Sequence, residues 1–336
     1  MHKDKKNDRY IISFKNVTKI FKTRKREKSW YLSFFSREYE MKKAVDNISF
    51  FVRKGEFVGL LGANGGGKST TVKMLSGILS PTEGEIRVNG IIPYKQRKQN
   101  SYNIGAMFGQ RSQLWWDLPL IETFKILRHI YRLSDDEFRK NFEILCDVLE
   151  LRRILNVPVR ELSLGQRVKA DFAAAVIHFP PIFYLDEPFV GIDTLCRMKL
   201  REFLKTINIE RKTTIILVTH NVKEIEGLCS RVFLLDKGRI VYDGDVFDLK
   251  KKCENYKTLI VEFRNPEKVS NLLLPGASLV KRDDNKFWFR FKGEVPVEIV
   301  NFIVDSQISN FTITEDIEEI VASIYKDLEE KNGQSF

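Results

Sequence analysis

One glycine-rich stretch, residues 62–69, carries the residue types best suited to chemistry in this chain. It reads Gly-Ala-Asn-Gly-Gly-Gly-Lys-Ser and matches the pattern of Gly, four residues, Gly, Lys and Ser or Thr. The glycines let successive backbone N–H groups turn toward one anion. We expect Lys68 to reach the β- and γ-phosphates of a nucleotide and the Ser69 hydroxyl to bind Mg²⁺. The candidate nucleotide-binding residues of this stretch are Gly62, Asn64, Gly65, Gly67, Lys68, Ser69 and Thr70.

A strand before this stretch and a helix after it are needed to hold it in place. Residues 57–61 form a short apolar run between two glycines, which is typical of a buried parallel strand. Residues 70–79 carry apolar side chains at helical spacing. The N-terminus of that helix is expected to point its dipole at the phosphates.

Two further apolar runs end in polar residues that could act on a bound phosphate. Residues 182–185 are followed by Asp186 and Glu187, and residues 213–219 by His220. Because the carboxyl ends of parallel strands meet at one edge of a sheet, we expect these side chains near the phosphate loop. Asp186 is then a candidate Mg²⁺ partner and Glu187 a candidate to polarise an attacking water. Alone, the acidic pair could simply cap a strand; the phosphate loop favours the catalytic interpretation.

A second anion site is predicted where a helix begins at residue 163. Ser163 is a good N-cap for the alanine-rich run at 170–176, and the following backbone N–H groups could bind an anion. By itself the segment is only a helix cap. The other predicted elements are strands at 11–21, 44–53 and 104–108, a turn, strand and turn over 81–90, a predominantly helical stretch at 120–177 broken at 157–159, and a helix at 197–209.

Composition limits the class of protein. With 43% hydrophobic and 30% charged residues the 336-residue chain is typical of a globular protein of about two domains. No apolar stretch approaches the roughly 20 residues of a membrane-spanning helix. Residues 1–6 lack the apolar core of a signal peptide, so we expect the cytoplasm or the cytoplasmic face of a membrane. The four cysteines match no metal-ligand spacing.

The net charge of +11 is concentrated at the N-terminal end, because residues 1–43 hold 14 Lys or Arg against 5 Asp or Glu. Residues 22–43 form an unusual segment in which a basic run leads into aromatic residues four positions apart over 29–39. A helix there could lie in a membrane interface and contact anionic lipid, or pack against the chain's own core or a partner subunit. A nucleic-acid-binding surface is a weaker inference, since the rest of the chain is nearly neutral.

The pattern changes from residue 254. Strands at 259–263, 278–281, 287–291 and 311–314 alternate with helices ending at 273 and covering 298–304, and a last helix covers 317–328. This order resembles a small βαββαβ domain with a terminal helix. It holds no visible catalytic cluster, so we interpret it as an accessory α+β domain.

From about residue 12 to 249 the motifs resemble those of the ATP-binding subunits of ABC transporters. Residues 62–69 look like the Walker A motif, 182–187 like Walker B and 162–166 like the ABC signature. The resemblance implies an α/β P-loop ATPase domain with an antiparallel β subdomain and a helical subdomain. We expect this domain at 1–250, with the 22–43 insertion and a helical subdomain at 118–177, and the accessory domain at 254–336.

The resemblance also implies roles for residues outside these motifs. Gln110 falls at the Q-loop glutamine, a Mg²⁺ and γ-phosphate contact, and His220 at the switch histidine. Asp193 falls at the D-loop aspartate and Phe21 at the aromatic residue that stacks on adenine. ATP is expected to lie between Walker A of one copy and the signature of another, contacted there by Ser163, Gly165 and Gln166.

The implied partners are a second ATP-binding subunit, giving a homodimer, and a separate integral membrane permease. Residues 108–119 and the C-terminal region look like one branch of the type-2, daunorubicin-resistance-like exporters. Leu164 departs from the usual signature glycine, so its side chain must point away from the phosphates or the site is altered. The alternative is a soluble ABC ATPase acting on nucleic acid or the ribosome through the basic N-terminal region.

Overall fold

The computed structural model describes residues 10–24, 39–109, 112–253, 256–263, 277–283, 285–292 and 308–314. The chain divides into two compact units, residues 1–243 and 244–336. The division falls before helix α8 (Val246–Cys253), whereas the sequence pattern placed it after residue 250. Within the described part of the chain, none of the helices combines the length and hydropathy needed to cross a bilayer.

The first unit is built around a six-stranded sheet in the order β5-β6-β7-β3-β8-β9. The five strands from β5 to β8 in that order are parallel. Every residue of β3, β6 and β7 is buried, as expected for parallel strands covered on both faces. The strands are β3 (Phe57–Gly62), β5 (Ile104–Phe108), β6 (Ile182–Asp186), β7 (Thr214–Thr219), β8 (Arg231–Asp236) and β9 (Arg239–Asp245).

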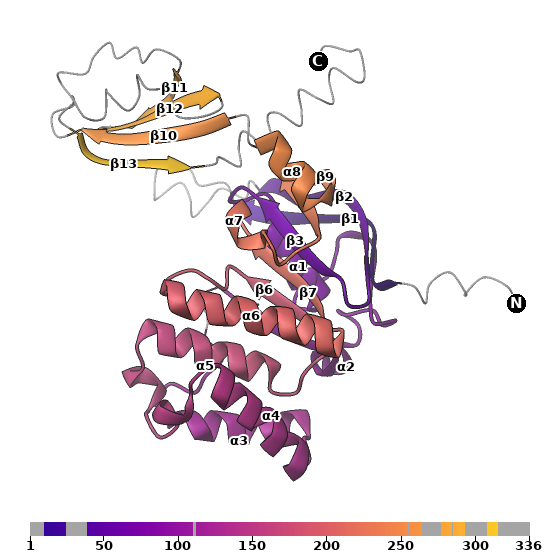
Figure 1. Ribbon diagram of the computed structural model, residues 1–336. Helices are drawn as coiled ribbons and strands as arrows, with labels where there is room; N and C mark the ends of the chain where they lie inside the picture. Colours follow the sequence, from indigo (N-terminus) through magenta and orange to yellow (C-terminus); the bar gives the residue numbers. More distant parts are fainter. Residues whose placement is uncertain are drawn as a thin grey trace, which may run out of the picture. The chain divides into compact units, whose positions relative to one another are not determined.

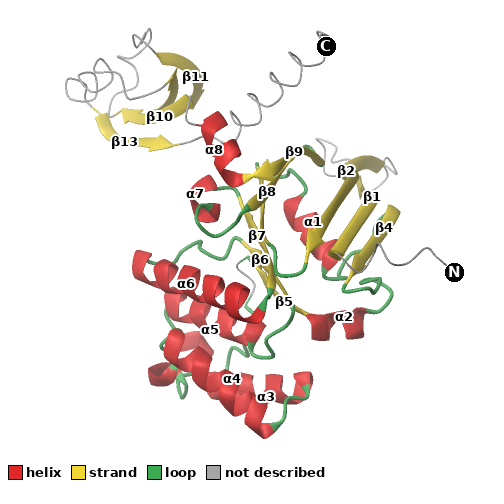
Figure 2. Cartoon of the chain, turned by 45° about the vertical axis from the view of Figure 1, so that its right-hand side comes forward, coloured by secondary structure: helices red, strands yellow, loops and turns green. Residues whose placement is uncertain are grey.

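Helix α1 (Lys68–Leu75) lies between this sheet and a second, antiparallel sheet (Figure 2). Val72, Met74 and Leu75 of α1 belong to the core cluster that joins the two sheets. The helix ends earlier than the predicted residue 79, because Gly77 adopts a left-handed φ of 79°. The core therefore fixes the helix that begins at Lys68.

The antiparallel sheet has the order β2-β1-β4, with β1 (Tyr10–Arg24), β2 (Tyr39–Arg53) and β4 (Glu83–Val88). β1 and β2 are longer than predicted, since they pair from Tyr10↔Arg53 to Arg24↔Tyr39. Residues 22–24 and 39–43 of the expected insertion are therefore strand. The predicted aromatic helix covers residues 29–39, of which 29–38 lie outside the described residues and Tyr39 is in a strand.

The predicted helical subdomain is present between β5 and β6 (Figure 1). Ser134 and Glu137 form a reciprocal capping box at the start of α4, and Ser163 and Gln166 form one at the start of α5. The predicted break at 157–159 lies between α4 and α5, where the chain forms two short 3-10 turns, at 152–154 and 159–161. The helices are α3 (Leu120–Tyr131), α4 (Asp135–Val148) and α5 (Leu164–Val176).

The other helices of the first unit are short except one. α6 (Thr194–Arg211) contains the predicted helix at 197–209. It begins three residues earlier than predicted, directly after its N-cap residue Asp193. The sequence pattern gave no expectation for α2 (Arg97–Asn103), α7 (Val222–Ile225), β8 or β9.

The second unit contains an antiparallel sheet in the order β11-β12-β10-β13. Leu259, Val261 and Phe263 of β10 pack with Phe287, Phe289 and Phe291 of β12. The four strands lie where the sequence pattern predicted strands, and the predicted helices of the βαββαβ arrangement lie outside the described residues. The strands are β10 (Tyr256–Phe263), β11 (Ala277–Asp283), β12 (Lys286–Lys292) and β13 (Ile308–Thr314).

Candidate nucleotide-binding and catalytic site

The glycine-rich loop connects β3 to α1 at the carboxyl edge of the parallel sheet. Gly67 is the N-cap of α1 and has a left-handed φ of 103°. Its carbonyl accepts hydrogen bonds from the Thr71 N–H at 2.9 Å and the Thr71 hydroxyl at 3.0 Å. The loop therefore leads directly into a helix N-terminus, whose N–H groups favour an anion.

Two of the loop glycines are required by the packing of the loop on neighbouring strands. A Cβ at Gly62 would lie 2.1 Å from the Leu235 carbonyl oxygen, and one at Gly67 2.5 Å from the Ala44 carbonyl oxygen. A Cβ at Gly65 would meet nothing within 4 Å. Gly62 and Gly67 are therefore needed for two reasons: neighbouring backbone leaves no room for a side chain, and a phosphate must be able to reach the loop N–H groups.

The contrast between two glycines gives a matched test. Gly62→Ala is expected to lower the free energy of unfolding by about 3 kcal/mol, since the β-carbon collides with backbone. In Gly65→Ala the alanine must adopt a φ of 85°, but its β-carbon meets no neighbouring atom. The free energy of unfolding should therefore fall by only about 1 kcal/mol. Urea unfolding of both variants measures the difference. Equal losses would contradict the packing explanation.

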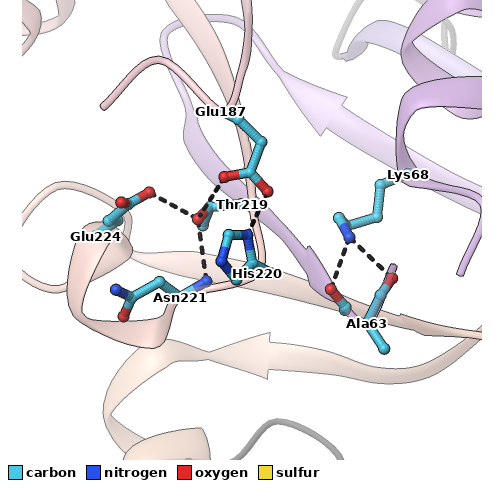
Figure 3. A network of polar contacts seen from close by, with 8 residues as sticks. Ala63, Lys68, Glu187, Thr219, His220, Asn221 and Glu224 are labelled. Atoms are coloured by element: carbon cyan, nitrogen blue, oxygen red, sulfur yellow. Dashed lines mark hydrogen bonds and ion pairs between the residues drawn. The ribbon is translucent and has the colours of Figure 1, made fainter. Parts of the chain in front are cut away.

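Lys68 is buried and its ammonium group lies within the loop (Figure 3). Nζ donates hydrogen bonds to the Gly62 carbonyl at 2.7 Å and the Ala63 carbonyl at 2.9 Å. Burial lowers the pKa of Lys68, and the carboxylates of Glu187 and Asp186 oppose this shift. The ammonium has three N–H donors, and two of them hold the loop. A cation is thus placed where a phosphate would approach the loop.

Asp186 ends β6, and its carboxylate accepts a hydrogen bond from the Ser69 hydroxyl. Burial raises the pKa of Asp186. A hydroxyl and a carboxylate side by side are oxygen ligands of the type that Mg²⁺ prefers, so these residues fit the ion that the sequence predicted. Among the described residues no three His, Cys, Asp or Glu side chains gather as a metal site. Gln110 lies outside the described residues.

Glu187 and His220 extend from the ends of β6 and β7 and contact each other directly. His220 Nδ1 lies 2.7 Å from Glu187 Oε1 (Figure 3). The Glu187 backbone has a φ of 54°, an unusual value for a residue with a side chain, and its N–H donates to the Val218 carbonyl at 2.9 Å. The side chains are 22% and 55% exposed, so water can reach the pair. The sequence predicted both residues at this edge, but not their contact.

The sequence pattern did not single out two residues that adjoin this pair, Thr219 and Glu224. The Thr219 hydroxyl donates to Glu224 Oε2 at 2.7 Å and lies 3.5 Å from Glu187 Oε2. A glutamate four residues after a candidate catalytic histidine is the signal that could have indicated them.

Ser163 and Gln166 are engaged with each other at the start of α5. The Gln166 N–H donates to Ser163 Oγ at 3.3 Å and the Ser163 N–H to Gln166 Oε1 at 2.9 Å. Leu164 is 55% exposed, and its Cδ2 lies 2.8 Å from the position that a Cβ on Gly191 would take. The leucine therefore lies against Gly191, in the loop after Glu187. Because residue 191 has no side chain, there is room for Leu164, which stands where the signature usually has glycine.

Two residues assigned through the resemblance have local roles here. Asp193 caps α6 by accepting the Cys196 N–H at 2.9 Å, and this bond lowers the pKa of the Asp193 carboxyl. Phe21 is half-buried on β1, with Lys19 Nζ 5.2 Å from its ring centroid. Both residues are in the first unit, and their contacts with a nucleotide stay predictions.

The segment after Gln110 is fastened to helix α5 through Asp171. Asp171 Oδ1 accepts the Ser112 hydroxyl at 3.0 Å and the Gln113 N–H at 2.9 Å. Asp171 is buried, and burial raises its pKa to about 6 although these hydrogen bonds and Arg167 oppose the shift. The Asp171 carboxylate thereby connects helix α5 to the segment that follows Gln110.

The raised pKa of Asp171 predicts a pH-dependent stability difference. Because the folded-state pKa of about 6 exceeds the usual value of 3.8, ionisation of Asp171 opposes folding as the pH rises through that range. Asp171→Asn is always neutral and retains an oxygen acceptor. It should raise the free energy of unfolding by about 2 kcal/mol at pH 8 and by nothing measurable at pH 4. Unfolding at both pH values measures this, and a gain that does not change with pH would contradict it.

Comparisons with known proteins agree with this fold. The ABC transporter family model matches residues 45–190. The chain is 36% identical over 211 residues to the uncharacterized ABC transporter ATP-binding protein MJ1023 of Methanocaldococcus jannaschii, a match that covers 63% of this chain and 75% of that protein. It is 33% identical over 238 residues to Nod factor export ATP-binding protein I of Neorhizobium galegae, covering 70% and 68%.

A solved structure is similar over much of the same region. The dimeric post-hydrolysis state of the ATP-binding cassette MJ0796, bound to ADP and Pi, matches with a TM-score of 0.59 and 28% identity, covering 70% of this chain and 98% of that one. The fold and the site therefore define a P-loop ATPase of the ATP-binding-cassette class. This chain belongs to the family of ABC transporter ATP-binding proteins. The predicted fold class, family and ATPase activity are confirmed.

Proposed function

We propose that this chain is the ATP-hydrolysing motor subunit of an exporter and works as a homodimer on a separate integral membrane permease. The observation that carries the proposal is the meeting of Lys68, Asp186, Glu187 and His220 at one edge of the parallel sheet. A cation for phosphate, a Mg²⁺ partner and a carboxylate held by an imidazole are the groups that ATP hydrolysis needs.

Each residue is assigned a step. The loop N–H groups and Lys68 bind the phosphates. Ser69, Asp186 and Gln110 would hold a Mg²⁺ ion, which would neutralise phosphate charge. Glu187 accepts a proton from the attacking water, and His220, 2.7 Å from it, orients Glu187 and stabilises the transferred phosphate. Phe21 stacks on the adenine. The remaining nucleotide contacts are Thr70 and Asp193.

The second half of each site comes from another copy of the chain. Ser163, Gly165 and Gln166 lie at a helix N-terminus, which favours the γ-phosphate of an ATP held by the partner's loop. The similar MJ0796 cassette is itself dimeric, which supports this arrangement. A lone chain should therefore hydrolyse ATP slowly.

The membrane permease is the second partner, at the cytoplasmic face of the membrane. Trp115 and Trp116 are 38% and 49% exposed, and they follow the segment that Asp171 fastens to α5. This exposed aromatic pair is suited to an interface with the permease. Export as the direction rests on the likeness to the Nod factor export protein, and the basic N-terminal region supplies a contact for anionic lipid. The alternative function, a soluble ABC ATPase that acts on nucleic acid or the ribosome, has no support among the comparisons.

The test compares membranes that contain or lack the permease. Far more of the chain should sediment with membranes that contain the permease than with membranes that lack it, and assembly should raise its ATPase rate. Retention on ribosomes or RNA instead, at an unchanged ATPase rate with the permease, would contradict the proposed function.

A further inference from the structure

A buried glutamate lies behind the candidate catalytic pair. Glu224, on α7, is 8% exposed and Thr219, at the end of β7, is fully buried. The Thr219 hydroxyl lies between two carboxylates, 2.7 Å from Glu224 Oε2 and 3.5 Å from Glu187 Oε2 (Figure 3). It also accepts the Asn221 N–H at 3.0 Å.

The hydroxyl has a single proton and can donate to only one of the two carboxylates. The shorter contact identifies Glu224 as the acceptor, since 2.7 Å is a full O–H···O hydrogen bond and 3.5 Å is not. Glu187 Oε2 therefore keeps its lone pairs, while Oε1 contacts His220. Glu187 Oε2 therefore accepts no full hydrogen bond from the Thr219 hydroxyl.

The position of Glu224 is fixed by the backbone around it. Arg201, on α6, donates from Nη1 to the Glu224 carbonyl at 2.7 Å and from Nη2 to the Glu226 carbonyl. The charged groups that act on the Glu224 carboxyl are Glu187, Arg197 and His220, and burial raises its pKa. In the described part of the chain no ion pair within 4.0 Å includes this carboxylate. Keeping a carboxyl group in this environment is unfavourable for folding, which indicates a functional reason.

We propose that Glu224 is a positioning residue for hydrolysis, which accepts the hydrogen bond of the Thr219 hydroxyl and so leaves Glu187 Oε2 to accept a proton from the attacking water. The inference rests on the proposed function, in which Glu187 is the general base. When Glu224 cannot accept, the Thr219 hydroxyl turns to Glu187, 3.5 Å away, and competes with the water.

The test uses a pair of variants whose effects oppose each other. Glu224→Met has no oxygen acceptor and should lower kcat about tenfold, with the ATP Kd unchanged within about twofold. Adding Thr219→Val removes the hydroxyl that competes, so the double variant should recover part of the lost kcat. Glu224→Gln keeps an oxygen acceptor and should lose less than Glu224→Met. A purely structural role predicts the reverse order, with the double variant worse than the single one.

Folded fraction, from circular dichroism, and ATP affinity are measured for every variant, and kcat is compared per mole of folded, ATP-binding protein. A kcat for Glu224→Met equal to wild type, or a double variant no faster than Glu224→Met, would overturn the inference. Either result beside a Glu187→Gln variant that has lost turnover leaves the proposed function intact. Retained turnover in Glu187→Gln overturns both.

Discussion

Glu187→Gln is expected to lower kcat at least about a hundredfold while the ATP Kd stays within about twofold of wild type. The carboxylate is the candidate base for the attacking water, and glutamine has the same shape but no basic oxygen. The amide oxygen can still accept from His220, whose Nδ1 lies 2.7 Å from Glu187 Oε1, so the local structure should persist. Steady-state phosphate release gives kcat, and binding of a fluorescent ATP analogue gives Kd.

Glu210→Gln is the matched control, since Glu210 is exposed at the far end of α6. It loses one carboxylate without touching the site and should hydrolyse ATP at the wild-type rate. Wild-type turnover in Glu187→Gln would remove Glu187 from its proposed role, and a large loss in the control would show that total charge, not the site, limits the rate.

Lys68→Ala should weaken ATP binding by at least about thirtyfold, because a buried ammonium group next to phosphate is lost. The same change removes the Nζ bonds to the Gly62 and Ala63 carbonyls, so the loop loses two of its supports as well. Isothermal titration with ATP and Mg²⁺ measures the affinity.

Lys73 follows Lys68 by five residues in α1 and is exposed. It provides the control for removing one positive charge from this helix. Lys73→Ala should keep ATP affinity within about threefold of wild type. Equal losses in the two variants would mean that helix charge as a whole attracts the nucleotide and that Lys68 has no special role.

The sequence sufficed for the parts of the site that depend on local pattern. The glycine spacing predicted the loop, and the apolar runs before Asp186 and His220 predicted buried parallel strands, which are β6 and β7. The capping role of Ser163 is also local, because its side chain and its N–H both bond to Gln166, three positions away.

What the sequence left open depends on strand register and on contacts between distant residues. The Glu187–His220 contact follows from the pairing of Asp186 with Val218 in β6 and β7, which no local pattern specifies. The need for glycine at 62 comes from the Leu235 carbonyl, on a strand with no sequence-based expectation.

The extension of β1 and β2 was missed for a similar reason. Arg24 and Tyr39 pair with each other, whereas the sequence pattern indicated a basic run at 22–28 followed by a possible aromatic helix over 29–39. The roles of Gln110 and of residues 25–38 stay predictions, since they lie outside the described residues.

The most direct test of the central claim, that a second copy completes each ATP site, is the mass of Glu187→Gln in solution with and without ATP. With ATP and Mg²⁺ bound and hydrolysis blocked, analytical ultracentrifugation should find a dimer, and with ADP it should find a monomer. A chain that binds ATP with wild-type affinity but sediments as a monomer in both nucleotides would contradict the account.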